Sequence, residues 1–170
     1  MFSLSGQKAL VVGVANAQSI AYGVAKALRA QGAELAVTYL NDRAEPHVRP
    51  LAEELGASLI LPLDVAEDAQ LDAVFDRITA EWGRLDTLVH SIAFCPKEDL
   101  HGRVLDSSRA GFGIAMDISV HSFVRMVRKA EPLMPQGGTC MTVSFYGAEK
   151  VMENYNIMGP VKSAQESVTR

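Results

Sequence analysis

Short apolar runs alternate with helix-like segments along the whole chain, and this alternation limits the possible folds more than any other feature. The runs span residues 8–13, 34–39, 58–63, 85–92 and 139–145. The clearest helical pattern between them consists of Leu71, Val74, Phe75, Ile78 and Trp82. Strands that alternate with helices are joined by crossovers, which predicts a parallel sheet covered by helices on both faces. We therefore expect an α/β, Rossmann-like, doubly wound fold of three α/β/α layers.

The helices and the strand count suggest how much of such a fold is present. Helical patterns cover about 20–31, 43–55, 71–82, 108–133 and 154–170, with Ser107 or Ser108 as the predicted cap of the fourth. A dinucleotide-binding sheet of this type has at least six strands, and only five are found here. We expect residues 1–170 to form a single dinucleotide-binding and catalytic domain that is truncated at its C-terminus.

Composition excludes several classes of protein. Hydrophobic residues make up 48% of the 170 residues and the formal net charge is −4, which is atypical of disordered chains and of nucleic-acid binders. No stretch approaches the roughly 20 apolar residues of a membrane span, and the start lacks the pattern of a signal peptide. Cys95 and Cys140 form no paired motif, and the histidines have no metal-ligand spacing. We expect a cytoplasmic protein that binds no metal, no membrane and no nucleic acid.

The turn after the first predicted strand, residues 13–21, is a candidate phosphate loop. It joins a strand to the start of a helix, where free N–H groups and the helix dipole favour an anion. Gly13 permits a tight turn, three alanines keep the backbone accessible, and Ser19 can cap the helix or donate to a phosphate oxygen. Only one glycine of the G-x-G-x-x-G pattern is present, so an ordinary βα turn explains these residues equally well at this point.

Two further strand ends are expected at the same edge of the sheet. Asp64 follows the third strand, where its carboxylate can accept from an adenine amino group or a ribose hydroxyl. A helix cap would explain Asp64 without a ligand. The segment Ser91–Ala93 ends the fourth strand and leaves room for a flat ring.

Two tyrosine–lysine pairs are candidates for a hydride-transfer site, which needs an O–H to stabilise an oxyanion and a cation beside the cofactor ribose. Tyr155 and Lys162 are seven residues apart, so two turns of the final helix would place both on one side. Tyr146 and Lys150 are four apart, but Tyr146 follows the fifth strand too closely for a helix to have begun. Pro160 suits only the first turns of the final helix. We prefer Tyr155 and Lys162, with a core tyrosine and a solvent-exposed lysine as the plain alternative.

Six segments together carry a family resemblance. They are Gly13-x5-Ser19-Ile20-Ala21-Tyr22-Gly23, Leu63–Val65, His90–Phe94, Asp117–Ser119, Ser144–Glu149 and Asn154–Gly159. With these segments and the Tyr-x6-Lys spacing, the chain resembles the enoyl-(acyl-carrier-protein) reductases of type II fatty acid synthesis. That family is a divergent branch of the short-chain dehydrogenase/reductase superfamily, whose ordinary carbonyl reductases carry Tyr-x3-Lys.

The resemblance implies an activity and a set of site residues. A nicotinamide cofactor would deliver hydride to the β-carbon of a trans-2-enoyl thioester on acyl carrier protein. Tyr155 would hydrogen-bond the enolate oxygen, and Lys162 would bind the nicotinamide ribose. The implied cofactor-binding residues are Gly13, Ser19, Ile20, Leu40, Asp64, Val65, Ile92 and Lys162. The expected substrate-binding residues are Cys95, Phe145, Tyr155 and Met158, the last as a flexible lining for an acyl chain.

Two departures from the family pattern bear on catalysis and on the cofactor. Phe145 stands where many members carry a second tyrosine, so it can shape the site or stack but cannot donate a hydrogen bond. Leu40 stands where an amide side chain would suit NADH better, and Arg43 nearby can meet a 2′-phosphate. NADH is the predicted cofactor, and NADPH stays open.

The family pattern continues beyond Arg170 into further strands, a loop over the substrate and much of a homotetramer interface. We therefore expect these 170 residues alone to be poorly stable and weakly active. Two other functions stay open: a carbonyl reductase that uses Tyr146 and Lys150, and a nucleotide-binding fragment without catalysis.

Overall fold

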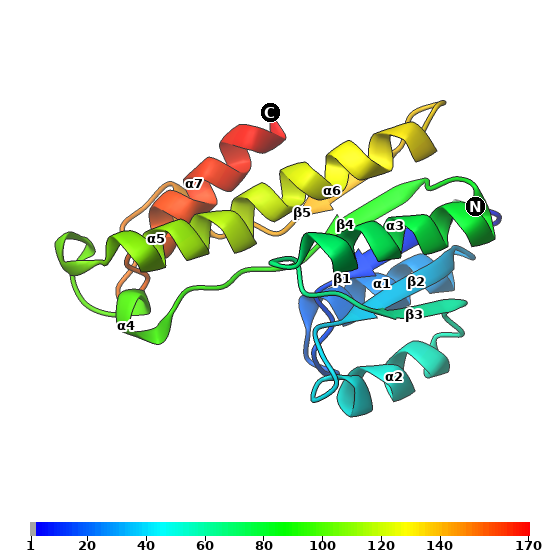
Figure 1. Cartoon of the computed structure of the whole chain (residues 1–170), viewed down its shortest axis with the longest axis horizontal. Coiled ribbons are helices and arrows are strands. Elements are labelled where there is room, and N and C mark those ends of the chain that lie inside the picture. The colour runs from blue at the N-terminus through cyan, green and yellow to red at the C-terminus, as the bar shows by residue number, and fades with distance from the viewer. Residues whose placement is uncertain (1–2) are drawn as a thin grey trace. The chain divides into compact units, whose positions relative to one another are not determined.

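The computed structural model describes residues 3–170 and contains a five-stranded parallel sheet (Figure 1). The strands are β1 (Lys8–Val12), β2 (Glu34–Tyr39), β3 (Leu59–Pro62), β4 (Thr87–His90) and β5 (Thr139–Thr142). Their order across the sheet is β3-β2-β1-β4-β5, and β1 pairs in parallel with both β2 and β4. The predicted α/β, Rossmann-like sheet is confirmed.

Within the described residues 3–170, seven α-helices accompany the strands. They are α1 (Ile20–Ala30), α2 (Glu45–Glu54), α3 (Asp68–Trp82), α4 (Lys97–Leu100), α5 (Arg109–Met116), α6 (Ser122–Ala130) and α7 (Met158–Thr169). A π-helical turn (Asp117–His121) separates α5 from α6, and 3₁₀ turns cover Val104–Asp106, Glu131–Leu133 and Tyr146–Ala148. Within residues 3–170, no helix has the length and apolar character needed to cross a bilayer.

The chain divides by its internal contacts into two compact units. Unit 1 comprises Met1–Ser91 and Met126–Met141, and it holds nearly all of the sheet. Unit 2 comprises Ile92–Arg125 and Thr142–Arg170, and it holds α4, α5 and α7.

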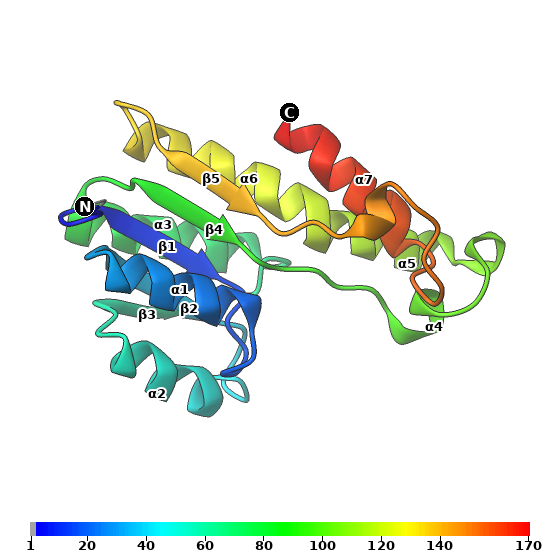
Figure 2. The ribbon, with the colours of Figure 1, turned by 180° about the vertical axis from the view of Figure 1, so that it is seen from behind.

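The core of unit 1 explains why the strands appear in the sequence as continuous apolar runs. Ala9–Val12 of β1 are at most 1% exposed, as expected for a parallel strand covered on both faces. Figures 1 and 2 show α1 and α3 on opposite faces of the sheet. On the α1 face, Val11 and Leu35 of the sheet share one apolar cluster with Ala25 of α1 and Val48 of α2.

Four predicted strands are shorter in the structure, and the predicted long helix is interrupted. The first, third, fourth and fifth strands cover 8–12, 59–62, 87–90 and 139–142. Ser108 caps α5 as predicted, because its hydroxyl accepts from the N–H of Gly111 at 2.9 Å. The helix does not continue evenly to Leu133. It widens into the π-helical turn, and α6 ends at Ala130 because Pro132 lacks an N–H for the next helical hydrogen bond.

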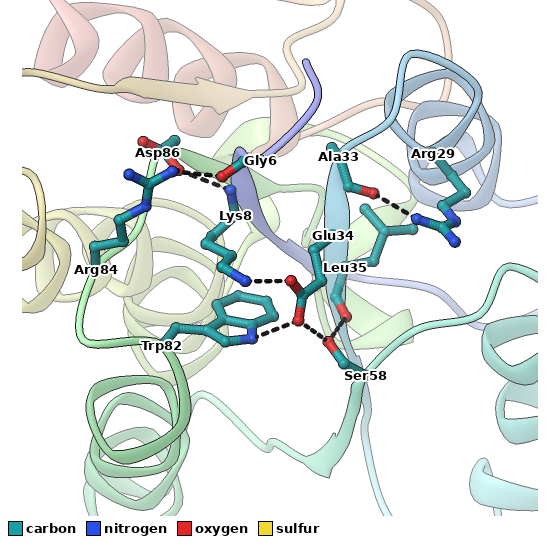
Figure 3. Close-up of polar contacts among 10 residues, drawn as sticks. All are labelled: Gly6, Lys8, Arg29, Ala33, Glu34, Leu35, Ser58, Trp82, Arg84 and Asp86. Atoms are coloured by element: carbon teal, nitrogen blue, oxygen red, sulfur yellow. Dashed lines mark hydrogen bonds and ion pairs between the residues drawn. The ribbon is translucent and has the colours of Figure 1, made fainter.

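A polar cluster ties the amino-terminal ends of the strands together (Figure 3). The Glu34 carboxylate accepts from the Lys8 ammonium, from the Trp82 indole N–H at 2.9 Å and from the Ser58 hydroxyl at 2.9 Å. These residues come from the starts of β1 and β2, the residue before β3 and the end of α3. The hydrogen bond from Lys8 holds the pKa of Glu34 below its ordinary value.

Glu34→Gln removes the charge and keeps the side-chain shape, so it isolates the ion pair. We expect a loss of about 0.5–1 kcal/mol in the free energy of unfolding at pH 7, an amount that already allows for solvent screening. A carboxyl whose pKa is lowered by folding stabilises the fold above its unfolded pKa of about 4.3. This contribution disappears as the pH falls through the lowered folded-state pKa. Urea unfolding should therefore show the difference at pH 7 and a progressively smaller difference as the pH falls below about 4.3.

Glu53→Gln is the matched control, because its carboxylate is 62% exposed and lies 4.0 Å from the Arg49 guanidinium. It should leave the unfolding free energy nearly unchanged. Equal losses in the two variants at pH 7 would contradict a special role for the Glu34 cluster.

Candidate active site

Gly13 follows β1 directly, at the point where β1 and β4 end side by side. Its φ is +106°, and a Cβ on this residue would lie 2.1 Å from the Ser91 carbonyl oxygen. The Ser91 N–H donates to the Val12 oxygen at 2.9 Å, which keeps the two chains at this distance. Glycine is required here both by the turn, as predicted, and by the close approach of the chain after β4.

The loop between Gly13 and α1 is held by its own hydrogen bonds. The Ser19 hydroxyl oxygen accepts from the backbone N–H groups of Ala15 and Asn16, each at 3.0 Å. Ser19 occupies the N-cap position of α1, but its side chain makes no capping hydrogen bond to the helix, so the capping interpretation is wrong. Because the oxygen serves as an acceptor, the hydroxyl hydrogen is left to donate to a ligand oxygen.

The other predicted nucleotide-binding residues of unit 1 follow the carboxyl ends of the strands or begin α1. Ile20 and Leu40 are 61% and 51% exposed, so both present apolar surface to solvent. Val65 is buried. Asp64 does not cap α3, which begins at Asp68; its carboxylate instead accepts from the Ala66 N–H at 2.9 Å.

In unit 2, the segment after β4 is fixed to the π-helical turn. Ser119 is fully buried in that turn, and its hydroxyl accepts from the Phe94 N–H at 3.0 Å and donates to the Phe94 oxygen at 3.2 Å. Ile92 is partly buried just before this anchor. Cys95, just after it, is half-buried against an apolar cluster, and burial raises the pKa of its thiol.

The structure corrects the predicted start of the final helix. We expected the helix from about Asn154, but α7 begins at Met158, so Tyr155 precedes it. The φ angles of Asn154 and Asn156 are +56° and +34°, which no right-handed helix contains. Pro160 is the third residue of α7, in the first turn as predicted. The argument that two helical turns align Tyr155 with Lys162 is therefore wrong.

Tyr155 packs in the apolar cluster of unit 2 that also includes Cys95 and Met158. Its ring centroid lies 4.8 Å from that of Phe145, with 58° between the ring planes. Gly147 makes room for the tyrosine, since a Cβ there would lie 2.6 Å from Tyr155 Cδ1. Burial raises the pKa of the Tyr155 phenol, which therefore stays protonated across the neutral range. The other three predicted substrate residues, Cys95, Phe145 and Met158, thus lie in the same cluster as Tyr155 or against its ring.

Lys162 is buried, with 5% of its surface exposed, so the alternative of a solvent-exposed lysine is wrong. Its ammonium donates to the Val143 carbonyl oxygen at 2.6 Å and to Gln165 Oε1 at 2.7 Å. No carboxylate among residues 3–170 pairs with it. Burial lowers the pKa of Lys162. Sequence reasoning missed Gln165, although its spacing of three residues from Lys162 on a helix was the signal available.

The alternative pair, Tyr146 and Lys150, lies on the surface. Tyr146 begins a 3₁₀ turn and is 59% exposed, and Lys150 is exposed as well. An open cavity of about 490 Å³ in unit 2 is bordered by Lys150, Tyr155 and the first turn of α7. Neither Tyr146 nor Lys162 borders this cavity. The structure therefore gives the alternative pair neither a shared helix nor a buried environment.

The start of α1 in unit 1 and the Lys162 ammonium in unit 2 each suit one part of a dinucleotide. The first turn of α1 carries no acidic residue, so its N-terminus can accept an anion without a competing carboxylate. The Lys162 ammonium has neutral partners for two of its three N–H groups, which leaves the third for a ribose hydroxyl. The described residues hold no group of three or more histidine, cysteine or acidic side chains placed to bind a metal ion.

Comparisons with known proteins identify a family. The family model described as enoyl-(acyl carrier protein) reductase matches residues 13–170. The NADH enoyl-(acyl-carrier-protein) reductase 1 of Rhizobium meliloti is 47% identical over 167 residues, which are 98% of this chain and 61% of that protein. The NADH enzyme of Aquifex aeolicus is also 47% identical, over 98% of this chain and 62% of its own length.

Solved structures show the same relationship. The enoyl-(acyl-carrier-protein) reductase of Anaplasma phagocytophilum in complex with NAD superposes with a TM-score of 0.94 and is 47% identical. The superposition covers 97% of this chain and 63% of that protein. The chain thus spans about six tenths of the length of these relatives, and the family resemblance seen in the motifs is confirmed.

Gly13→Ala tests the close approach after β1. The added Cβ would meet the Ser91 backbone, which cannot yield without breaking the Ser91–Val12 hydrogen bond. Gly137→Ala is the control, since its φ is +89° and nothing lies within 4 Å of the added Cβ. Thermal or urea unfolding should show Gly13→Ala less stable than Gly137→Ala by about 2 kcal/mol or more. If Gly13→Ala and Gly137→Ala lose the same unfolding free energy, glycine is needed at position 13 only because of its positive φ, and the close approach of Ser91 adds no cost.

Proposed function

The chain belongs to the enoyl-(acyl carrier protein) reductase family, and on this premise we propose that it reduces the trans-2 double bond of enoyl thioesters carried by acyl carrier protein, with NADH. One observation carries the proposal within this chain. A buried lysine surrounded by neutral oxygens and a half-buried phenol lie within the same unit, and together they supply the two groups that hydride transfer to an enoyl thioester requires.

Nucleotide binding is the next proposed role. We propose contacts to NADH from Gly13, Ser19, Ile20, Leu40, Asp64, Val65, Ile92 and Lys162. The Ser19 hydroxyl donates to a phosphate oxygen, and exposed Ile20 and Leu40 offer apolar surface to the adenine ring. Lys162 donates its remaining N–H to a nicotinamide ribose hydroxyl. Because Leu40 has no charge, its side chain supplies no attraction for a 2′-phosphate.

Tyr155 is the proposed hydrogen-bond donor to the substrate. The cofactor, when bound, supplies the hydride to the β-carbon of the enoyl group. Negative charge then develops on the thioester carbonyl oxygen, and the Tyr155 O–H stabilises it by a hydrogen bond. The positive charge of Lys162 strengthens this donor electrostatically, because no carboxylate among the described residues offsets it.

The substrate residues that we propose are Cys95, Phe145, Tyr155 and Met158. Phe145 is 45% exposed and stacks at an angle on Tyr155, so it shapes the approach to the phenol but donates no hydrogen bond. Cys95 and Met158 supply apolar surface from the same cluster as Tyr155. We assign the Cys95 thiol no nucleophilic role, since burial keeps it protonated.

The remaining proposals concern the setting of the protein. We propose a cytoplasmic enzyme that acts as a homotetramer and that has acyl carrier protein, and neither nucleic acid nor membrane, as its partner. The formal net charge of −4 supports the absence of a nucleic-acid partner. We also propose that residues 1–170 belong to one dinucleotide-binding and catalytic domain.

Tyr155→Phe removes one hydroxyl and keeps the ring that packs on Phe145. We expect NADH-dependent reduction of crotonyl thioester to fall by about 10²–10³-fold, the usual effect of removing one oxyanion donor. The NADH dissociation constant, measured by calorimetry, should change less than about threefold, because the phenol acts on the substrate.

Tyr146→Phe is the matched control, since it removes a hydroxyl from an exposed ring. It should leave turnover unchanged with crotonyl thioester. If only Tyr146→Phe loses turnover, and the substrate that reveals the loss is a ketone, the protein is instead a carbonyl reductase. NADH binding without turnover of either substrate would assign a nucleotide-binding protein without catalysis.

A further inference from the structure

Gln165 is a buried polar side chain in contact with Lys162, and the family resemblance assigns it no role. It is fully buried on α7, one turn after Lys162. Its amide oxygen accepts from the Lys162 ammonium at 2.7 Å, and its amide NH₂ donates to the Thr142 hydroxyl at the end of β5. Both ends of the amide are therefore engaged, which fixes the orientation of the group.

The ammonium is thus held at two points of different origin. Val143, the residue after β5, supplies one acceptor through its backbone, and α7 supplies the other through Gln165. A lysine side chain has four rotatable bonds, and two directed hydrogen bonds restrict it to one position. Only the second of these bonds depends on the identity of a side chain.

The neutrality of both acceptors also matters. A buried ammonium paired with a carboxylate would lose much of its field at neighbouring groups, whereas an amide and a carbonyl orient it without cancelling its charge. Glu166 is next to Gln165 in sequence, but its carboxylate accepts from the Ser144 hydroxyl. Neither Glu166 nor any other acidic side chain within residues 3–170 makes an ion pair with Lys162.

We propose that Gln165 is a positioning residue, which holds the Lys162 ammonium at the end of β5 with its full charge and with one N–H directed to the bound nucleotide. The proposal rests on the proposed function, because the nucleotide is the NADH assigned there. Gln165 itself touches neither cofactor nor substrate in this scheme and acts only through Lys162.

Two variants of Gln165 separate its effect on the position of the Lys162 ammonium from the effect of its neutral charge. Gln165→Met keeps an unbranched side chain of similar volume and removes both amide hydrogen bonds. Gln165→Glu keeps an oxygen for the ammonium and adds a negative charge. Ser167→Ala, on the exposed side of the same helix, is the control. Each protein is labelled with ¹³C-lysine, the Lys162 signal is assigned with Lys162→Met, and its pKa is followed by NMR. NADH affinity is measured by calorimetry on the same samples.

We expect the Lys162 pKa to fall in Gln165→Met, because the charged form loses an acceptor, and to rise in Gln165→Glu, because it gains an anion. The NADH dissociation constant should rise about tenfold in Gln165→Met, the usual effect of losing a hydrogen bond to a charged group. Gln165→Glu should keep it within about threefold of wild type, since the position of the ammonium is retained. Ser167→Ala should change neither quantity.

The results that overturn the proposal are distinct. An unchanged Lys162 pKa in both Gln165 variants would show that the contact is absent in solution. Shifted pKa values with an unchanged NADH affinity in Gln165→Met would make Gln165 a structural residue only. If Gln165→Met fails to fold, Gln165→Asn replaces it, because the shorter side chain withdraws the amide oxygen from the ammonium, and the same two expected results and contradicting results apply. Wild-type protein that binds no NADH would remove the proposed function and the role of Gln165 with it, while the pKa shifts would still report the contact.

Discussion

The double pairing of β1 is the constraint on which the rest of unit 1 depends. Because β1 pairs with β2 and β4 and is buried along Ala9–Val12, its register determines where its neighbours end. Val12 lies opposite His90, so the next residues, Gly13 and Ser91, meet where the two strands separate. A side chain at Gly13 would overlap the Ser91 backbone. The glycine is therefore fixed by the sheet first, and a phosphate loop is one use of the turn that results.

In unit 2, polar contacts act together with the apolar cluster around Met158 to hold α7 in place. Thr142, Val143, Ser144 and Ala148 each receive a hydrogen bond from, or donate one to, a side chain of α7. These contacts attach α7 to the segment that follows β5, so the location of the Lys162 ammonium is determined by backbone and side chains of that segment. The spacing of Lys162 from Tyr155 along the chain has no part in this.

The fold was largely predictable because its determinants are local or repetitive. β2 has the predicted bounds, since every residue after Glu34 is buried and apolar except Thr38. The start of α7 was not predictable from spacing, because two asparagines with positive φ keep Tyr155 outside the helix. The burial of Lys162 and Gln165 was missed because polar residues three apart on a helix are normally solvated. Their partners come from residues about twenty positions earlier, which periodicity cannot reveal.

Burial shifts the pKa values of Tyr155 and Lys162 in opposite directions, and both shifts follow from one cause. Desolvation disfavours whichever form is charged, so it raises the pKa of the phenol and lowers that of the ammonium. The phenol therefore remains a donor well above neutral pH, whereas Lys162 gives up its proton more readily than an exposed lysine does. The hydrogen bonds from its ammonium to Val143 and Gln165 favour the charged form and oppose the loss of that proton, so the two acceptors that position the lysine also extend the pH range in which it carries its charge.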